Sequence, residues 1–376
     1  MAILIVSAPN DADAHAVKFA INDLGEQCDI FYSYDYCDMA EWSLDLNQER
    51  FHSEYRGVSE EWDFSRYKSV WMRRPASVVP RTHICDDRER AAAEAEARSF
   101  LSSTLRLIEK DKFVASPIAS VRRANEKIYQ FREALKVGLP MPPTLISNSK
   151  ARILDFFDVQ NQDIIYKTLV PMMWQIEDNR FASTPTTAIS NPRVLMECDL
   201  ASAPGIYQKR IEKLAEVRVT VLGRTILALE KTFPTRLLCD LQVDWRAIHS
   251  EAAYKHIQLP SALSERIFKL LENLNLVMGC LDFIVDLEGN YTFLEINPQG
   301  QFLWIDQVRP EMNHLEAMVE FLLSSDPNFV YKNTDNINLS SVSRRDRYDA
   351  LSRNERERHF GEINSIAFGQ LSMSLL

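Results

Sequence analysis

Two carboxylates and an amide are spaced along the chain so that a divalent cation could bind between them. The segment Leu281–Gln301 reads LDFIVDLEGNYTFLEINPQGQ, two apolar strands on either side of a glycine-containing turn. A turn centred on residues 288–289, with an uninterrupted register, predicts that Asp282 directly faces Glu295 and that Asn297 lies further along on the same face. Asp, Glu and an amide oxygen are ligands that Mg2+ takes together with substrate phosphates.

The alternative is an ordinary hairpin with a solvated acidic face. Directly opposed carboxylates repel each other, and a cation between them would remove the repulsion. Replacing Asp282 or Glu295 by its amide should then stabilise the protein without its metal. Because the flanking residues are apolar, we favour a metal site.

The composition is that of a globular protein with more than one core. The 376 residues suggest two or three domains, and 46% of them are hydrophobic and 26% charged. A net charge of -10 argues against nucleic-acid binding, which needs a concentrated basic field. No apolar run is long enough to span a membrane, and the N-terminus lacks the basic region of a signal peptide. The six cysteines are scattered without a C-x-x-C pair, so we expect reduced thiols and a cytoplasmic location.

The order of expected strands and helices divides the chain into four parts. Residues 1–115 begin with a strand, a helix and a second strand, which predicts an N-terminal α/β domain without a G-x-G-x-x-G dinucleotide motif. Residues 116–205 form a central lid domain whose stretch 170–189 is interpreted as a hairpin or flap. Residues 206–327 are rich in strands and contain the acidic hairpin. Residues 328–376 are a polar extension whose structure the pattern does not predict.

A metal held in this way usually accompanies a nucleoside triphosphate, so basic side chains should reach its phosphates. Lys127 begins the helix EKIYQFREALKVGLP, and Lys167 ends the strand DIIYK. Either lysine alone is readily explained as a solvated surface charge. Lys167 is harder to explain in that way because it closes an apolar run.

Together these segments resemble the ATP-grasp superfamily, and within it the microviridin-type peptide ligases, also called graspetide macrocyclases. The resemblance is carried by Trp71-Met72-Arg73-Arg74-Pro75, by the runs NEKIYQFREALKVGLPMPPTLISN, IIYKTL and YQKRIEKLAEVRVTVLG, by Asp244-Trp245-Arg246, and by the acidic hairpin. It covers residues 1–325. It implies an α/β fold with an α+β lid: an N-terminal α/β domain, a central lid domain and a C-terminal domain, with ATP and Mg2+ as cofactors.

The resemblance also implies roles for residues of the nucleotide site. Lys127 and Lys167 would contact the ATP phosphates. The adenine hinge would consist of Gln208, Lys209 and Ile211. Glu216 would bind the ribose hydroxyls, or alternatively form a strand-end ion pair with Arg218. The run TLVPMMWQ stands after Lys167 where a glycine-rich phosphate loop would be expected.

The remaining implied roles concern catalysis and the metal. Lys231 and Arg246 would place cations on the γ-phosphate and on the acyl-phosphate, and Arg218 is included among the catalytic residues. Asp282, Glu295 and Asn297 would hold magnesium, in agreement with the geometry of the hairpin.

The activity that the resemblance implies is an ADP-forming ligase of peptide maturation. It would activate Asp or Glu side chains of a ribosomal precursor peptide as acyl-phosphates. A Ser or Thr hydroxyl, or a Lys amine, would then close a lactone or lactam ring, the maturation of a ribosomally synthesised and post-translationally modified peptide (RiPP). The precursor would dock on the flap through Met172, Met173 and Trp174, unless these side chains simply pack inside the lid. The resemblance also allows a homodimer.

Two alternatives stay open. The chain could be an ATP-grasp ligase that adds amino acids to a free small molecule or to a protein carboxylate, although the W-x-R-R-P and D-W-R segments disfavour this. It could also be a non-catalytic ATP- or peptide-binding protein, although the intact set of metal ligands disfavours that.

Overall fold

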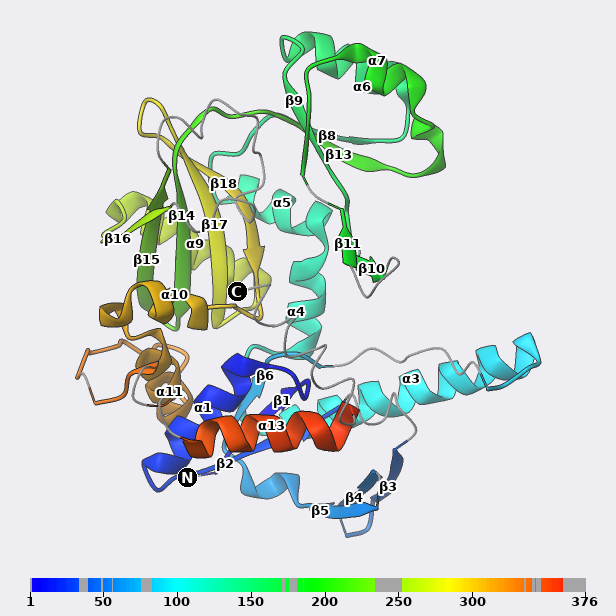
Figure 1. Ribbon diagram of the computed structural model, residues 1–376, viewed down its shortest axis with the longest axis vertical. Coiled ribbons are helices and arrows are strands. Elements are labelled where there is room, and N and C mark those ends of the chain that lie inside the picture. The colour runs from blue at the N-terminus through cyan, green and yellow to red at the C-terminus, as the bar shows by residue number, and fades with distance from the viewer. Residues whose placement is uncertain are drawn as a thin grey trace.

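The chain forms three main sheets, arranged one above another in Figure 1. The computed structural model describes residues 2–33, 40–48, 50–55, 57–75, 83–170, 173–175, 181–184, 186–233, 252–334, 336–339, 342 and 346–360. No helix in these ranges is long and apolar enough to cross a bilayer.

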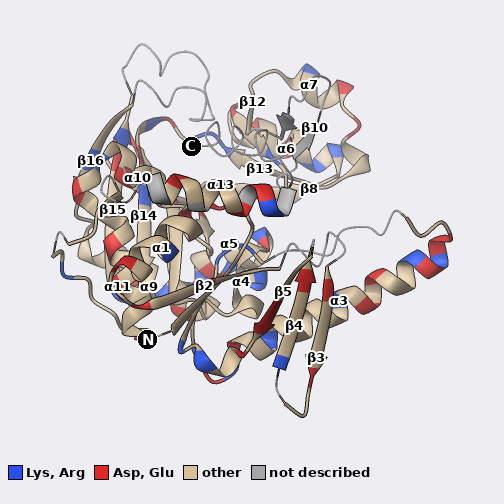
Figure 2. Cartoon of the chain, turned by 60° about the horizontal axis from the view of Figure 1, so that its bottom comes forward, with Lys and Arg blue, Asp and Glu red and all other residues tan. Residues whose placement is uncertain are grey.

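The N-terminal part is a parallel sheet in the order β2-β1-β6-β7, at the bottom of Figure 1. Its strands are β1 (Ala2–Ser7), β2 (Gln27–Tyr32), β6 (Ser69–Met72) and β7 (Phe113–Ala115), and its helices are α1 (Ala12–Asp23) and α3 (Asp87–Glu109). Residues 3–6 of β1 are fully buried because parallel strands are covered on both faces. A small antiparallel sheet of β3 (Glu41–Asp45), β4 (Arg50–Tyr55) and β5 (Val58–Trp62), with the 3-10 turn η1 (Phe64–Arg66), completes this part (Figure 2).

The central part is an antiparallel sheet in the order β12-β9-β13-β8, at the top right of Figure 1. Its elements are β8 (Thr144–Ser147), α6 (Lys150–Val159), β9 (Ile164–Lys167), β12 (Thr187–Ile189), α7 (Pro192–Glu197), the 3-10 turn η3 (Leu200–Ser202) and β13 (Gly205–Lys209). The two helices that precede them, α4 (Ile118–Asn125) and α5 (Lys127–Lys136), lie below this sheet in Figure 1 and pack against the third sheet. The expected flap contains an antiparallel pair, β10 (Met173–Gln175) and β11 (Phe181–Ser183).

The third part is a five-stranded antiparallel sheet in the order β16-β15-β14-β17-β18. Its strands are β14 (Lys213–Leu222), β15 (Thr225–Thr232), β16 (Ala253–Ile257), β17 (Met278–Asp286) and β18 (Tyr291–Asn297), with α9 (Ser261–Leu274) on one face. The apolar residues Val217, Val219 and Phe283 share a core with Ile267 and Leu270 of α9. Because side chains alternate along a strand, the intervening residues of β14 and β17 lie on the opposite face.

The C-terminal residues return to the N-terminal sheet. They comprise α10 (Leu303–Val308), the 3-10 turn η6 (Pro310–Met312), α11 (His314–Ser324) and α13 (Asp346–Phe360), which lies across α1 in Figure 1. The buried carboxylate of Glu316 on α11 accepts the backbone N–H of Asn336 at 2.7 Å and the hydroxyl of Thr334 at 2.7 Å. Ser352 on α13 lies 3.0 Å from the ring of His15 on α1. The extension that the sequence left unassigned is therefore packed on the rest of the molecule where it is described.

Candidate metal and nucleotide site

Three charged residues form a row across neighbouring strands of the five-stranded sheet. Arg218 on β14 lies opposite Asp282 on β17, and Asp282 lies opposite Glu295 on β18. The predicted facing of the two carboxylates is confirmed. They lie on the face of the sheet that points away from α9.

The facing depends on a bulge that the sequence pattern did not predict. Near the turn, Phe283 pairs with Phe293 and Val285 with Tyr291, one residue out of step with the register that we expected. The register shifts between Asp282 and Phe283, where the extra residue of β18 is Leu294. Without this bulge Leu294 would face Asp282, and Glu295 would point to the opposite face of the sheet.

The protein's own cations neutralise both carboxylates. Nη1 of Arg218 donates to both carboxylate oxygens of Asp282, at 2.9 and 2.8 Å, and Nζ of Lys127 lies 2.7 Å from the carboxylate of Glu295. These two cations partly balance the repulsion between the carboxylates that we expected a metal ion to relieve. Removing the charge of Asp282 would relieve the cost of its burial but would leave Arg218 without its carboxylate, so the expected stabilisation of an amide variant stays a prediction.

The pKa values of the two carboxyls are shifted in opposite directions. Burial raises the pKa of Asp282, the charge of Glu295 adds to this, and Arg218 only partly opposes it. Burial also tends to raise the pKa of Glu295, but the charges of Lys127, Lys167 and Arg218 outweigh it and hold that pKa below its ordinary value. The ammonium of Lys167, at the end of β9, is therefore close enough to act on Glu295 from the lid sheet.

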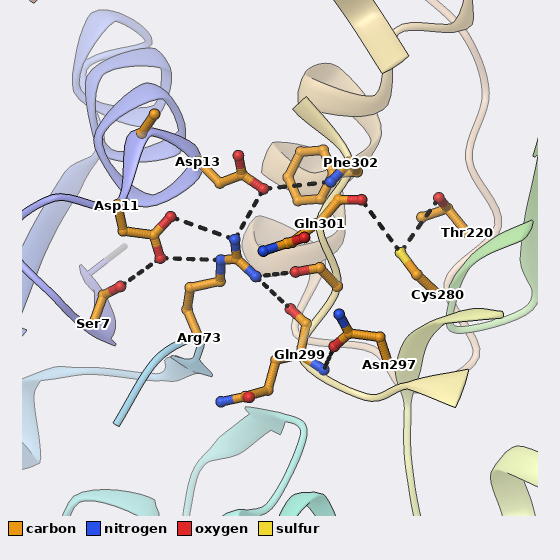
Figure 3. A network of polar contacts seen from close by, with 12 residues as sticks. Ser7, Asp11, Asp13, Arg73, Thr220, Cys280, Asn297, Gln299, Gln301 and Phe302 are labelled. Atoms are coloured by element: carbon orange, nitrogen blue, oxygen red, sulfur yellow. Dashed lines mark hydrogen bonds and ion pairs between the residues drawn. The ribbon is translucent and has the colours of Figure 1, made fainter. Parts of the chain in front are cut away.

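The third predicted ligand, Asn297, is the last residue of β18 and pairs with Cys280. Its amide oxygen accepts the backbone N–H of Gln299 at 3.2 Å. The loop that follows is held by the guanidinium of Arg73, which comes from the end of β6 (Figure 3). The carbonyl of Gln301 in the same loop accepts Nη2 of Arg218 at 3.2 Å, so the loop and the charged row are in contact.

Gln130 is a site residue that our reading of the sequence missed. It is fully buried on α5, three residues after Lys127 and therefore on the same face of the helix. Its amide accepts the N–H of Ile296 at 3.1 Å and donates to the carbonyl of Ile296 at 2.9 Å. β18 is an edge strand, and the side chain of Gln130 supplies the two hydrogen bonds that a further strand would make with Ile296, the residue between Glu295 and Asn297. A polar residue at helical spacing from Lys127 was the available signal.

Of the other residues that the resemblance assigned, Glu216 and Lys231 lie in the same sheet as this row. Glu216 pairs with Lys213 at 2.5 Å and lies opposite Lys231 in the sheet, so the alternative ion pair with Arg218 is not formed. The side chain of Lys231 is 5% exposed, and its ammonium lies 4.7 Å from the ring centroid of Phe233. Arg246 lies outside the described residues, as does Met172, and the side chains of Met173 and Trp174 are not described.

The residues of the expected adenine hinge lie at the end of β13 in the lid sheet and in the link to β14 of the five-stranded sheet. The backbone N–H of Lys209, at the end of β13, donates to the carbonyl of Pro143 at 3.0 Å, and the exposed side chain points to solvent. Ile211 is half-buried in the link to β14. Gln208 is fully buried, and its Nε2 donates to the hydroxyl of Thr144 at 3.0 Å. Within the part of the chain that the structure describes, no donor reaches its Oε1 atom.

These residues fit a nucleotide with a divalent cation. The buried Oε1 of Gln208 is an acceptor of the kind that the amino group of adenine would satisfy. Two carboxylates and an amide suit Mg2+, which completes its shell with phosphates and water. In the ranges that can be described, no three His, Cys, Asp or Glu side chains gather into a metal cluster by themselves. Basic side chains outnumber acidic ones in this part of the structure, which suits the binding of phosphates. The basic residues are Arg218, Lys127, Lys213, Lys231 and Lys167, and the acidic ones are Glu216, Asp282 and Glu295.

Comparisons with known proteins find similar folds among solved structures but no similar sequences. No protein-family model matches the chain, and no curated protein sequence matches it. The crystal structure of the macrocyclase MdnC with the precursor peptide MdnA, from Microcystis aeruginosa, aligns with a TM-score of 0.72 at 23% identity and covers 86% of this chain and 100% of that one. A RiPP-associated ATP-grasp ligase of Chryseobacterium gregarium, in complex with ADP and a leader and core peptide, aligns with a TM-score of 0.72 at 25% identity and covers 87% and 97%.

The ligase PsnB, in complex with a minimal precursor, Mg and ADP, aligns with a TM-score of 0.66 at 18% identity and covers 86% and 96%. The chain has the ATP-grasp fold of these RiPP-associated ligases, which confirms the expected α/β fold class.

Proposed function

We propose that the chain is an ADP-forming ATP-grasp ligase that closes lactone or lactam rings in a ribosomal precursor peptide. The observation that carries the proposal is the row of Arg218, Asp282 and Glu295 with Lys127, in which two carboxylates face each other and each is paired with a cation. The likeness to ligases whose structures hold ADP and precursor peptides supports the same substrate classes here.

The proposed reaction has two steps. A carboxylate oxygen of an Asp or Glu side chain in the precursor attacks the γ-phosphorus of ATP, and the bond from that phosphorus to the bridging oxygen breaks as ADP leaves. A Ser or Thr hydroxyl, or a Lys amine, of the same peptide then attacks the acyl carbon. Inorganic phosphate leaves with the electron pair of the broken bond, and the nucleophile loses its proton. Each ring closed removes the elements of one water from the peptide.

The residues of the site would divide this work. Asp282, Glu295 and Asn297 would hold magnesium, which when bound supplies positive charge to the phosphates and needs both carboxyls ionised. Arg218 favours the ionised form of Asp282, although burial opposes it. Lys127 pairs with Glu295 in this structure and would contact an ATP phosphate if magnesium held that carboxylate, as the family resemblance implies. We assign Lys167, Lys231 and Arg246 to the transferred phosphoryl group and Glu216 to the ribose, as the family resemblance implies.

Several finer points belong to the same proposal. We propose magnesium as the physiological cation, a microviridin-type product and a cytoplasmic location, which the free cysteines Cys28, Cys85, Cys198 and Cys280 support. We propose the expected division with one change. Because β13 (Gly205–Lys209) pairs with β8 and β9, the lid ends after Lys209 rather than at residue 205.

The test is a reconstitution with the full chain, ATP, Mg2+ and a synthetic copy of a short acidic peptide encoded beside its gene. We expect ADP and phosphate, and a mass loss of about 18 Da for each ring, by condensation of the activated acyl group. AMP formation would exclude the acyl-phosphate route. Addition of a free amino acid to the peptide would identify the ligase of free substrates. ATP and peptide binding without any turnover would identify a non-catalytic protein.

A further inference from the structure

Arg73 lies where the N-terminal sheet meets the loop that follows Asn297 (Figure 3). It is 3% exposed, and its backbone N–H donates to the carbonyl of Val6 at 3.1 Å. Nε lies 3.1 Å from the carboxylate of Asp11, and Nη2 lies 3.2 Å from that of Asp13. These contacts fix the orientation of the guanidinium on the side that faces away from the loop.

The remaining nitrogen of the guanidinium is directed at the loop. Nη1 of Arg73 donates to the carbonyl of Gln299 at 3.3 Å and to the carbonyl of Gly300, which is 227 residues away in the sequence. The backbone N–H of Gln299 in turn donates to the amide oxygen of Asn297. Asp13 also accepts the N–H of Phe302 at 3.4 Å, so the same buried cluster holds the far end of the loop.

The backbone of the loop after Asn297 is restricted at Gly300. Gly300 has a φ of +70°, which favours glycine, and a Cβ there would lie 3.3 Å from Met278 and 3.5 Å from Cys280. A buried Arg–Asp cluster could serve stability alone. This cluster also sets the backbone of the residue that donates to Asn297, and it therefore acts on the orientation of that amide.

We infer that Arg73 is a positioning residue for the metal site: by holding the carbonyls of Gln299 and Gly300, it sets the orientation of the Asn297 amide. The inference rests on the proposed function, in which Asn297 is a metal ligand. Residues that orient a ligand from outside the coordination shell are worth about 10- to 100-fold in metal affinity.

The experiment measures binding of a fluorescent ADP analogue to the full chain as a function of Mg2+ concentration. Arg73→Lys keeps a cation beside Asp11 and Asp13 but lacks the planar fork that reaches two carbonyls. We expect it to raise the Mg2+ concentration at half-saturation by about 10-fold. The matched control is Glu316→Gln, which weakens another buried carboxylate, the acceptor for the backbone N–H of Asn336, without touching Arg73 or the loop. It should lower the Tm but change the Mg2+ requirement by less than about twofold.

A double-mutant cycle with Asn297→Ala separates positioning from general stability. If Arg73 acts through Asn297, Arg73→Lys should raise the Mg2+ requirement by less than about twofold when Asn297 is already Ala. An equal factor in both backgrounds, or no effect of Arg73→Lys while the wild type binds ADP with Mg2+, would overturn the inference and leave the proposed function standing. A wild type that binds no ADP in the presence of Mg2+ would overturn both.

Discussion

The carboxylate row and the amide loop of the candidate site are built in different ways. Asp282 and Glu295 face each other through the backbone ladder of neighbouring strands, and cations on β14 and α5 neutralise them. Asn297 ends its strand, and the loop beyond it is held by Arg73 from the N-terminal sheet. The carboxylate row therefore depends on the balance of charges, and the amide loop depends on hydrogen bonds that orient its backbone.

This difference shows how the site divides its tasks between parts of the fold. A backbone ladder places side chains with little help, but it leaves the charges of opposed carboxylates to be balanced. A loop beyond the strand end has no ladder, so other elements must supply its hydrogen bonds. The comparison predicts that substitutions in the row change charge balance and chemistry, whereas substitutions around the loop and the edge strand change affinity and stability.

The largest effect is expected in the row itself. Asp282→Asn should lower ATP turnover by more than about 100-fold, beyond the effect of residues outside the coordination shell. The free energy of unfolding should change by no more than about 1 kcal/mol, because relief of the burial that raises the pKa of Asp282 offsets the loss of its pair with Arg218. ADP release and urea unfolding measure the two effects.

Asp286→Asn is the matched control for this substitution. Asp286 ends the same strand, where it accepts the backbone N–H groups of Glu288 and Asn290 at 3.0 and 2.7 Å, outside the charged row. Its turnover should stay within about twofold of the wild type because no ligand is lost. Near wild-type turnover of Asp282→Asn would remove the metal assignment.

A smaller effect is expected at the edge strand, which depends on Gln130. Gln130→Leu leaves the backbone N–H and carbonyl of Ile296 buried without their partner, which should cost about 2 kcal/mol of unfolding free energy. Because Ile296 stands between Glu295 and Asn297, the Mg2+ requirement for ADP binding should rise by about 10-fold.

Ile128→Ala on the same helix is the control for Gln130→Leu. Its side chain is 59% exposed, so neither stability nor Mg2+ requirement should change beyond experimental error. If Gln130→Leu lowered the Tm but left the Mg2+ requirement unchanged, the edge strand would serve stability alone.

A third effect concerns pH. Both carboxyls must be ionised to hold a cation, so the acid limb of Mg2+-dependent ADP binding follows the carboxyl whose pKa is raised, Asp282. Arg218→Met removes the cation that lowers this pKa, so the limb should move to higher pH. A fluorescence titration of the ADP analogue across pH measures the shift.

Arg224→Met controls for the loss of an arginine from the same part of the sheet. Arg224 lies over the ring of Phe268 at 4.1 Å and not beside the carboxylate row. Its acid limb should coincide with that of the wild type. A limb that stays in place in Arg218→Met would show that Asp282 does not control binding at low pH.

The smallest effect is expected at the side chain of Lys209, in the expected adenine hinge. Lys209 is engaged through its backbone N–H, and its side chain is exposed. Lys209→Ala should therefore change ADP affinity by less than about twofold, while Gln208→Leu, which removes a buried acceptor, should weaken it by about 10-fold. Equal losses in both variants, measured by the same titration, would place the Lys209 side chain on the nucleotide.

The sequence by itself predicted the strand pair and the facing of its two carboxylates. Alternation of apolar and polar residues has a period of two in a strand, so the hairpin pattern alone indicated that Asp282 and Glu295 share a face. The segments around Lys127, Lys167 and the hairpin also carried the family resemblance, and with it the ATP-grasp fold that the structural comparison confirmed.

Only the tertiary structure decided how these ligands are balanced and held. The bulge at Leu294 shifts the pairing of β17 with β18 by one residue, so that Asp282 pairs with Glu295 instead of Leu294. The partners Arg218, Lys127, Gln130 and Arg73 reach the hairpin from strands and helices that are distant in sequence. Local periodicity encodes which face a residue occupies, but contacts between distant elements depend on how the sheets and helices pack, and a local pattern carries no information about that packing.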